Sequence, residues 1–344
     1  MNHSDQNSSN IDENPFETVA EVNEVSRNER YKSLLNDWVL TPLRIAWSDR
    51  RTRIGGLIVF TYVLMGTVGV VVLKPPETGY PILVPPFTDP YYILGTNGLG
   101  QPILRSIVYA TPAMLKMITA GAVFSTILAT GVGVVSGYKG GRTDRILTTI
   151  TDVMLTIPGL PLIIVVSAIF QPKSPLVIGV LLTINSWAGL ARSIRSQVLT
   201  IRNQSYVEAS RKMGMSTPMI LRRDILPNIM PFIMINFVGA ARYVIFASVG
   251  LYFLGILPFT TLNWGVMMNL AYEGTGALYS LSSAHTIILP MVAIVILSYG
   301  LTLIAQGSDR LFNPRVRARH MGMSRTTEKG DEDQNRSTSI DMMG

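Results

Sequence analysis

Cysteine is absent from the 344-residue sequence. Without cysteine the chain can form neither a disulfide framework nor a thiolate metal site. Histidine is also scarce: the three copies, His3, His285 and His320, are far apart in sequence, so no histidine metal cluster is expected. The dipeptide Gly-Lys does not occur, which excludes a phosphate-binding loop of the GxxxxGK[ST] type. We therefore expect a chain that binds no metal and does not itself hydrolyse ATP by this route.

Charged residues are few and unevenly distributed. They make up 15% of the chain, against roughly 25% in an ordinary soluble domain. Hydrophobic residues make up 48% and form long uncharged runs, with the charges between the runs and at the two ends. This pattern is typical of a membrane protein. The net charge of +7 comes from basic residues that flank the apolar runs, so it indicates membrane topology rather than a nucleic-acid partner.

Both ends of the sequence are polar. Residues 1–33 are rich in Asn, Ser, Asp and Glu, and we expect a disordered cytoplasmic tail. A signal peptide would need a basic start and an apolar middle, which this segment lacks. Residues 315–344 are expected to form a second cytoplasmic tail. The region between them, 34–314, is predicted to be the membrane domain.

Six apolar segments approach the length of a membrane span. A bilayer core about 30 Å thick requires roughly 20 apolar helical residues. The expected fold class is therefore all-α: a polytopic membrane protein with six transmembrane helices. The predicted spans are about 54–73, 117–136, 146–170, 175–191, 229–257 and 286–305.

The distribution of Lys and Arg predicts the orientation. With both termini inside, the cytoplasmic connections and flanks hold nineteen Lys and Arg residues, and the outer side holds four. Cytoplasmic loops of membrane proteins carry the excess of positive charge. We therefore expect a multi-pass protein of the cell membrane with both termini in the cytoplasm.

Two predicted spans contain residues that shape helices. Gly133 and Gly137, four residues apart in the second span, allow another helix to approach closely. Ordinary packing within the bundle is favoured over a special dimer contact. Pro158 and Pro161 in the third span free backbone groups and are expected to kink it.

Asp152 and Arg242 are charged residues inside the third and fifth predicted spans. Because an unpaired charge is costly in a membrane, each should face the bundle interior or a water-filled cavity. Both are thus possible intramembrane polar sites. For Arg242, pairing with a carboxylate or lining an aqueous path is favoured over direct contact with a transported solute.

The longest cytoplasmic connection, 192–228, has the pattern of two helices joined by a turn. Tyr206 to Met213 favours a helix, and Gly214 is a natural stop because glycine enters the left-handed region without cost. Pro218 suits the first turn of a second helix. We expect that helix to end near Leu226-Pro227 and to lead into the fifth span.

This connection resembles the EAA loop of binding-protein-dependent ABC importer permeases, through Glu208-Ala209-Ser210, Gly214, Ile220 and Ile225-Leu226-Pro227-Asn228. A resemblance to the dipeptide/oligopeptide/nickel class of these permeases extends along nearly the whole chain between the tails. The other matching segments are Gly95-Thr96-Asn97 with Gly100; Gly137-Tyr138-Lys139-Gly140-Gly141 with Asp144 and Asp152; Trp187, Ala191-Arg192, Arg195 and Gln197-Val198-Leu199; Phe253-Leu254-Gly255; Trp264-Gly265; and Asn313-Pro314-Arg315.

The resemblance implies a MetI-like permease bundle and a set of partners. These are two cytoplasmic ATPase subunits that use ATP and Mg, a second homologous permease chain, usually different from the first, an extracellular solute-binding protein and membrane lipid. The chain itself is expected to bind no cofactor and not to be an enzyme. In this family the EAA helix inserts into a groove on the ATPase. The residues that the resemblance assigns to this coupling are Glu208, Ala209, Ser210, Arg211, Lys212, Met213 and Gly214.

The residue types agree with such a role. Ala209 and Ser210 are small and permit close docking, Gly214 allows the reversal, and Arg211 and Lys212 can pair with acidic groups of the partner. Five positions depart from the family pattern. Ser210 replaces an alanine, Asp224 replaces a frequent histidine, Asn97 replaces an aspartate, and Gln101-Pro102 replaces a usual Arg-Asp.

The leading hypothesis is the permease subunit of an ATP-driven importer for peptides or solutes of similar size. One alternative is a secondary transporter or channel that works without ATPases, for which an inverted repeat and intramembrane ion-binding charges would be expected. Another is a membrane scaffold, which would tolerate a bulky residue in place of Gly214. Peptides, oligosaccharides and metal complexes all remain open as cargo.

Overall fold

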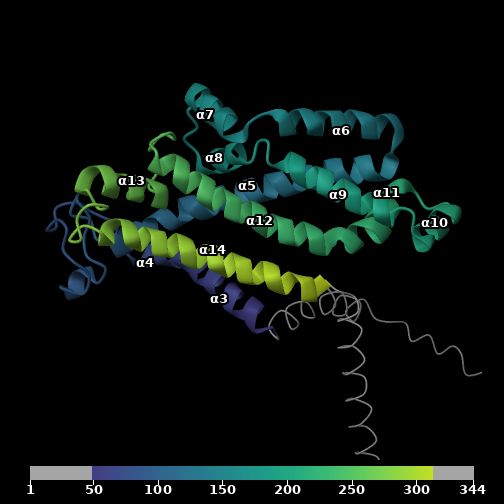
Figure 1. The fold of residues 1–344 in the computed structure, drawn as a ribbon. Coiled ribbons are helices and arrows are strands. Elements are labelled where there is room, and N and C mark those ends of the chain that lie inside the picture. Colours follow the sequence, from purple (N-terminus) through teal and green to yellow (C-terminus); the bar gives the residue numbers. More distant parts are fainter. Residues whose placement is uncertain (1–48, 313–344) are drawn as a thin grey trace, which may run out of the picture. The chain divides into compact units, whose positions relative to one another are not determined.

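The computed structural model describes residues 49–312, and they form a bundle of α-helices (Figure 1). All of them belong to one compact unit, Ile45–Gly344. Within the described range the β-structure is an isolated bridge between Thr96 and Pro102. The prediction of an all-α chain is therefore confirmed. The predicted tails, 1–33 and 315–344, lie outside the described residues.

The helices follow one another with short connections, except for the irregular segment 73–102 and the links on either side of α13. In chain order they are α3 (Arg50–Leu64), a π-helical turn (Met65–Gly69), α4 (Val70–Val72), a 3₁₀ turn (Pro90–Tyr92), α5 (Ile103–Lys139), α6 (Gly141–Thr156), α7 (Gly159–Phe170), α8 (Pro175–Leu182), α9 (Trp187–Ile201), α10 (Ser205–Lys212), α11 (Thr217–Ile220), a second π-helical turn (Leu221–Ile225), α12 (Leu226–Phe253), α13 (Trp264–Thr275) and α14 (His285–Phe312).

Four continuous helical segments are long and apolar enough to cross a membrane, and two bent pairs raise the number to six if each pair is one span. The count refers to the described residues, by length and composition. The predicted second span, 117–136, is only the later part of a longer helix, because α5 begins at Ile103. The continuous segments are Arg50–Val72, Ile103–Lys139, Thr217–Phe253 and His285–Gly307.

The third and fourth predicted spans are the bent pairs. The axes of α6 and α7 differ by 84°, and those of α8 and α9 by 58°. Pro158 causes the first break, since it precedes α7 with extended backbone (ψ 119°) and has no N–H to donate. Pro161 lies in the first turn of α7, where a missing N–H costs little. The expected kink is therefore a sharp break at Pro158 alone.

The connection 192–228 is more helical than its prediction as a loop. The α9 helix passes through Arg192 without interruption, because Ile194 and Val198 are fully buried on its other side. The second helix of the connection does not end near Leu226-Pro227 either. It continues into α12 through the π-helical turn Leu221–Ile225, in which the N–H of Leu226 bonds to the carbonyl of Leu221. A local change to the wider π turn accommodates the proline that follows.

The α13 helix, a short helix between the last two spans, was not predicted from the sequence. Asn263 begins it by accepting a hydrogen bond from the N–H of Val266 (3.0 Å), and Gly276 ends it in the left-handed conformation (φ 58°). Asparagine and glycine at these positions are ordinary start and stop signals. At 12 residues α13 is too short to cross a bilayer core.

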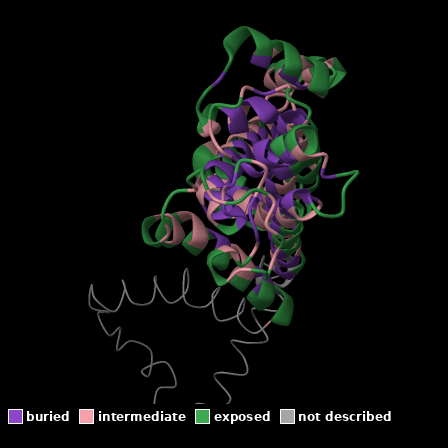
Figure 2. Cartoon of the chain, turned by 90° about the vertical axis from the view of Figure 1, so that its left-hand side faces the viewer, coloured by how far each residue is buried: buried purple, intermediate pink, exposed green. Residues whose placement is uncertain are grey.

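Buried side chains concentrate in the middle of the bundle, and exposed ones lie on its outer helices (Figure 2). The α5 helix packs against α8, α9 and α12, while α3 packs against α14. In the larger core cluster Trp264 is fully buried, and its Nε1 donates to the carbonyl of Ile107 (3.3 Å). Its ring meets that of Tyr62 edge to face, with the ring centroids 5.7 Å apart. A second cluster surrounds α9 and the start of α12.

Glycines allow the closest approaches between helices. A Cβ added to Gly133 would lie 2.6 Å from the carbonyl oxygen of Ala191, and one added to Gly137 would lie 2.8 Å from the Cβ of Val198. Both partners are on α9, so this pair of glycines serves helix packing within the chain. A Cβ on Gly179 would lie 2.2 Å from the carbonyl oxygen of Met117, which brings α8 equally close to α5.

Candidate functional site

The segment from Ser205 to Ile220, which we call the elbow, reverses the chain between α9 and α12. The turn after α10 is a Schellman motif: the N–H of Gly214 donates to the carbonyl of Arg211 (3.1 Å), and that of Met215 donates to Ser210 (3.2 Å). Gly214 has φ 75°, a left-handed conformation that glycine adopts without strain. The turn therefore depends on glycine for its backbone conformation.

A buried apolar core fixes the elbow to the bundle. Val207 of α10 and Ile220 of α11 are essentially fully buried, together with Val198 of α9 and Ile225 of the π-helical turn. Side chains of this size each contribute about 1.5–3 kcal/mol when removed from water. The elbow is therefore a packed extension of α9 and α12, and a force on it acts on both helices.

The outward face of the elbow is partly apolar. Met213 is 68% exposed, Met219 52% and Tyr206 43%. Glu208 and Ala209 are exposed as well, whereas Ser210 is buried at 7%. Of the two small residues expected to face a partner, only Ala209 is exposed. Ser210 follows Val207 by three positions on α10 and so lies on the same inward side.

The charged residues of the elbow already have partners within the chain. Lys212 Nζ lies 2.9 Å from Glu208 Oε1, an i,i+4 pair that is well exposed. The Arg211 guanidinium lies over the ring of Tyr138, 5.7 Å from its centroid. Exposed pairs of this kind contribute little to stability, about 0–1 kcal/mol. The Arg211 contact nevertheless joins the elbow to the end of α5.

Asp224, where the family often has histidine, lies in the π-helical turn that follows the elbow. Its Oδ2 atom is buried without a hydrogen-bond partner among the described residues. Asn228 donates from Nδ2 to the carbonyl of Asp224 (2.7 Å) and to the hydroxyl of Tyr206 (3.2 Å). Burial, and then the nearby Asp224 carboxylate, raise the pKa of the Tyr206 hydroxyl.

The two charged residues predicted inside spans lie in separate places. Asp152 on α6 forms an ion pair with Arg192 on α9 and lines a cavity of about 290 Å³ between α5, α6 and α9. Arg242 on α12 donates from Nε to the Ser298 hydroxyl of α14 (3.3 Å). The structure does not bring them together, and neither belongs to the elbow.

A second polar arrangement lies around Asn97, at the opposite end of α5 from the elbow. The Asn97 side chain accepts from the N–H groups of Leu99 and Gln101 (2.9 Å each) and donates to Gln101 Oε1 (3.0 Å). Thr96, fully buried, donates to the carbonyl of Pro81 (2.6 Å). Asn97 and Gln101 thus form a neutral hydrogen-bonded pair at this turn.

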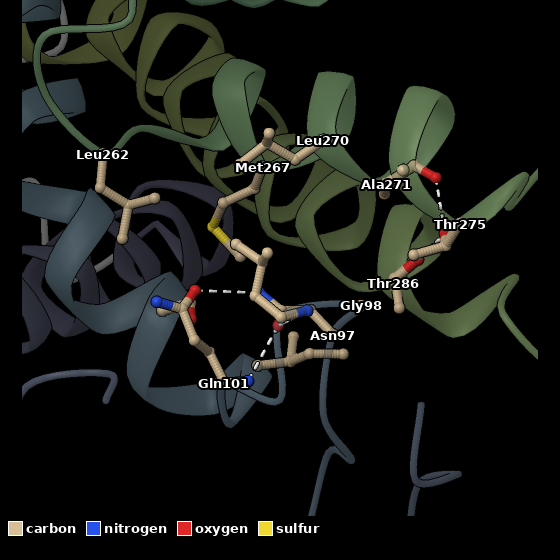
Figure 3. A pocket seen from close by; sticks show the side chains of 13 residues that line it. Asn97, Gly98, Gln101, Leu262, Met267, Leu270, Ala271, Thr275 and Thr286 are labelled. Atoms are coloured by element: carbon tan, nitrogen blue, oxygen red, sulfur yellow. Dashed lines mark hydrogen bonds between the residues drawn. The ribbon is translucent and has the colours of Figure 1, made fainter. Parts of the chain in front are cut away.

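This turn borders a cavity of about 140 Å³ that α13 covers from the other side. Figure 3 shows Met267 and Leu270 of α13 on one side and Asn97 and Gln101 on the other. His285 at the start of α14 contacts the carbonyl of Thr96 through Nε2 (3.1 Å). Sequence reasoning matched Asn97 to a motif but gave no sign of this cavity, because α13 itself was not predicted.

Comparison with known proteins places these features in context. A family model described as "Binding-protein-dependent transport system inner membrane component" matches residues 129–318. The dipeptide transport system permease protein DppC of Bacillus subtilis (strain 168) is 32% identical over 239 residues, which are 68% of this chain and 71% of that protein. The oligopeptide transport system permease protein OppC of the same strain is 28% identical over 312 residues, which are 90% and 99%. Among solved structures, an inward-facing MetNI methionine ABC transporter is similar over 62% of this chain and 97% of that chain, with 21% identity and a TM-score of 0.49.

Proposed function

Because the chain belongs to the family of binding-protein-dependent transport system inner membrane components, we propose that its elbow is the surface on which the ATPase of the importer docks. As a member of this family, the chain is a multi-pass membrane protein and the permease subunit of an ABC importer. It is not the catalytic subunit, since the ATPase of such importers is a separate chain. The family also implies partnership with another permease and with a binding protein.

The observation that supports docking most directly is the contrast between the two sides of α10. Its inner side carries the buried Val207 and Ser210, and Val207 belongs to an apolar cluster with residues of α9 and α12. Its outer side presents Ala209 and the exposed Met213, with Tyr206 and Met219 nearby. Large apolar side chains exposed together at the end of a bundle suit a partner surface. The coupling role therefore falls on Glu208, Ala209 and Met213, while Ser210 and Gly214 hold the shape.

The finer composition of the complex is part of the proposal. We place both termini and the elbow in the cytoplasm because the Lys and Arg residues favour that side. Two ATPase subunits, which bind the ATP and Mg, would then act on two permease chains, this one and a different homologous partner. An extracellular solute-binding protein would deliver cargo at the opposite end. Short peptides are the proposed cargo, since the DppC and OppC relatives bear the names of dipeptide and oligopeptide permeases.

Site-specific cross-linking tests the docking proposal. The chain has no cysteine, so a photo-cross-linker attached to Met213→Cys reacts from one known position of this chain. In the membrane complex we expect an adduct with the ATPase subunit. Tyr279→Cys is the matched control, because its side chain is also well exposed, at 85%, but lies next to α13. ATPase adducts from the Tyr279 position and none from the Met213 position, in a complex that still contains the ATPase, would refute the proposal.

A further inference from the structure

Two motif segments that the elbow does not use are joined in space. Asp144 and Asp152 belong to the stretch after α5, and Arg192 and Arg195 lie ahead of the elbow on α9. Arg195 donates from Nε and Nη2 to the two carboxylate oxygens of Asp144, each at 2.6 Å. Arg192 pairs with Asp152. Each arginine of α9 thus holds one carboxylate of α6.

The same line of contacts extends in both directions. Arg202, at the end of α9, donates from Nη1 to the carbonyl of Gly137 at the end of α5 (2.9 Å). Asn185, in the turn before α9, donates from Nδ2 to the carbonyl of Ile157 (3.3 Å). That carbonyl is at the break between α6 and α7, so the two helix breaks of the bundle meet there.

Two of these donors share one side of the helix: Arg192 and Arg195 are three residues apart within α9 and so lie on the same face. Asn185 precedes Arg192 by seven residues and Arg202 follows Arg195 by seven, one just before and the other just after the helix. The adjoining face carries the buried Ile194 and Val198. The α9 helix therefore has an apolar side for the core and a polar side directed at α6.

The α6 helix buries few of its side chains. Thr151 is its only buried residue, Met154 packs partly buried against the second core cluster, and Ile146 at 60% and Val153 at 53% are exposed. In Figure 1 α6 runs along the edge of the bundle beside α9. The paired charges are not equally exposed: the side chains of Arg195 and Asp144 are 30% and 19% accessible, whereas those of Arg192 and Asp152 are 60% and 59%.

We propose that Asp144–Arg195, Asp152–Arg192 and Ile157–Asn185 form a clamp that makes α6 move together with α9 when the ATPase displaces the elbow. These residues are positioning residues for coupling: they carry the displacement to the break at Pro158. The Asp144–Arg195 pair, bidentate and the less exposed, fixes the orientation of the two helices. The inference rests on the proposed function, because the displacement of α9 is supplied at the elbow.

The clamp makes a prediction about distances that needs no knowledge of the cargo. Spin labels can be attached to cysteines at the exposed positions Thr149 on α6, Ser196 on α9 and Val295 on α14. Distances are measured in the full membrane complex, nucleotide-free and trapped with Mg-ATP and vanadate. We expect the Thr149–Ser196 distance to stay constant while the Thr149–Val295 distance changes. If Thr149–Ser196 changes as much as Thr149–Val295, or if neither changes, the clamp is refuted.

Charge exchange separates a specific pairing from general damage. Asp144→Arg and Arg195→Asp should each broaden the Thr149–Ser196 distribution and abolish the trapping-dependent change at Thr149–Val295. The double variant D144R/R195D should restore both. Arg145→Asp is the matched control, since it reverses the neighbouring charge, for which the described residues show no ion pair. Single variants that behave as the parent chain, or a double variant no better than the singles, would overturn the proposal.

The elbow cross-link distinguishes the two proposals. With the Met213 cross-linker present, the single charge variants should still form the ATPase adduct, because the clamp lies behind the docking surface. Loss of coupled movement with the adduct retained supports the clamp. No adduct in the parent chain would instead mean that the docking proposal has failed, and the clamp with it.

Discussion

The α9 helix is held on two sides by different chemistry. Toward α5 the contact is steric: Gly133 and Gly137 leave no room for a Cβ, and the backbone of α9 lies directly against them. Toward α6 the contact is ionic, through Arg192 and Arg195, beside a polar cavity of about 290 Å³. One interface is a close backbone contact, and the other is made by long charged side chains beside a cavity.

The two interfaces should therefore respond differently to substitution. A glycine contact depends on volume, since interiors are packed as tightly as crystals and one added methylene is felt. An ion-pair contact depends on charge and on screening by salt, and tolerates small changes of position. The comparison predicts large, salt-independent effects at the glycines and smaller, charge-specific effects at the aspartates.

Gly137→Leu should have the largest effect. Even the Cβ of the new side chain would lie 2.8 Å from the Cβ of Val198 and 2.9 Å from the carbonyl oxygen of Arg195. Because leucine adds three further carbon atoms to a contact that is already too close for a Cβ, we expect a loss of about 3 kcal/mol or more. The thermal midpoint of the purified chain in detergent and its level in the membrane measure this. A variant with parental stability would show that α9 does not lie against α5 here.

Gly133→Ala tests the same contact between α5 and α9 by adding a single carbon atom. Replacing glycine by alanine inside a helix normally stabilises it by about 0.5–1 kcal/mol. At Gly133 the Cβ would meet the carbonyl oxygen of Ala191 at 2.6 Å, so we expect a net loss of about 1–2 kcal/mol. Gly131→Ala, two residues earlier on α5 with nothing within 4 Å, is the control and should gain stability. Equal thermal shifts for both variants would contradict the packing.

Asp144→Asn should have the next largest effect on thermal stability. The amide keeps one acceptor for Arg195 but removes the charge, and leaving a partly buried charged donor poorly paired costs about 1–3 kcal/mol. Since the two side chains retain some access to water, we expect the lower end of that range. Arg145→Gln, a neutralisation at the next position, should leave the midpoint unchanged. A midpoint for Asp144→Asn equal to that of the control would mean that the pair contributes nothing.

The sequence predicted the helical spans and the elbow because both depend on local signals. Apolar runs of sufficient length mark the spans, and Gly214 marks the turn. Where helices continue without a break was harder to predict. Arg192 was expected to begin a loop, yet it lies on the polar side of the uninterrupted α9 helix. Pro227 was expected to end a helix, but the π-helical turn that precedes it lets the helix continue through the proline.

The pairing of charges could not be read from the sequence. The three-residue spacing of Arg192 and Arg195 is visible there, and it predicts that the two share a face if 187–201 is recognised as helix. Which carboxylates meet that face depends on how α6 packs beside α9, a tertiary contact that no local rule supplies. For the same reason Ser210 was expected on the docking surface, although the packing of α10 turns it inward.

Asp152→Asn should have the smallest effect and completes the comparison. Its pair with Arg192 leaves both side chains about 60% exposed, and exposed pairs contribute about 0–1 kcal/mol. The expected shift of the thermal midpoint is therefore less than for Asp144→Asn. Raising the salt concentration should shrink the difference between Asp152→Asn and the parent chain, since salt screens exposed charges more strongly than buried ones. The Gly133→Ala difference should not respond to salt. If it does, or if Asp152→Asn destabilises more than Asp144→Asn, the division of α9 into a steric and an ionic side is wrong.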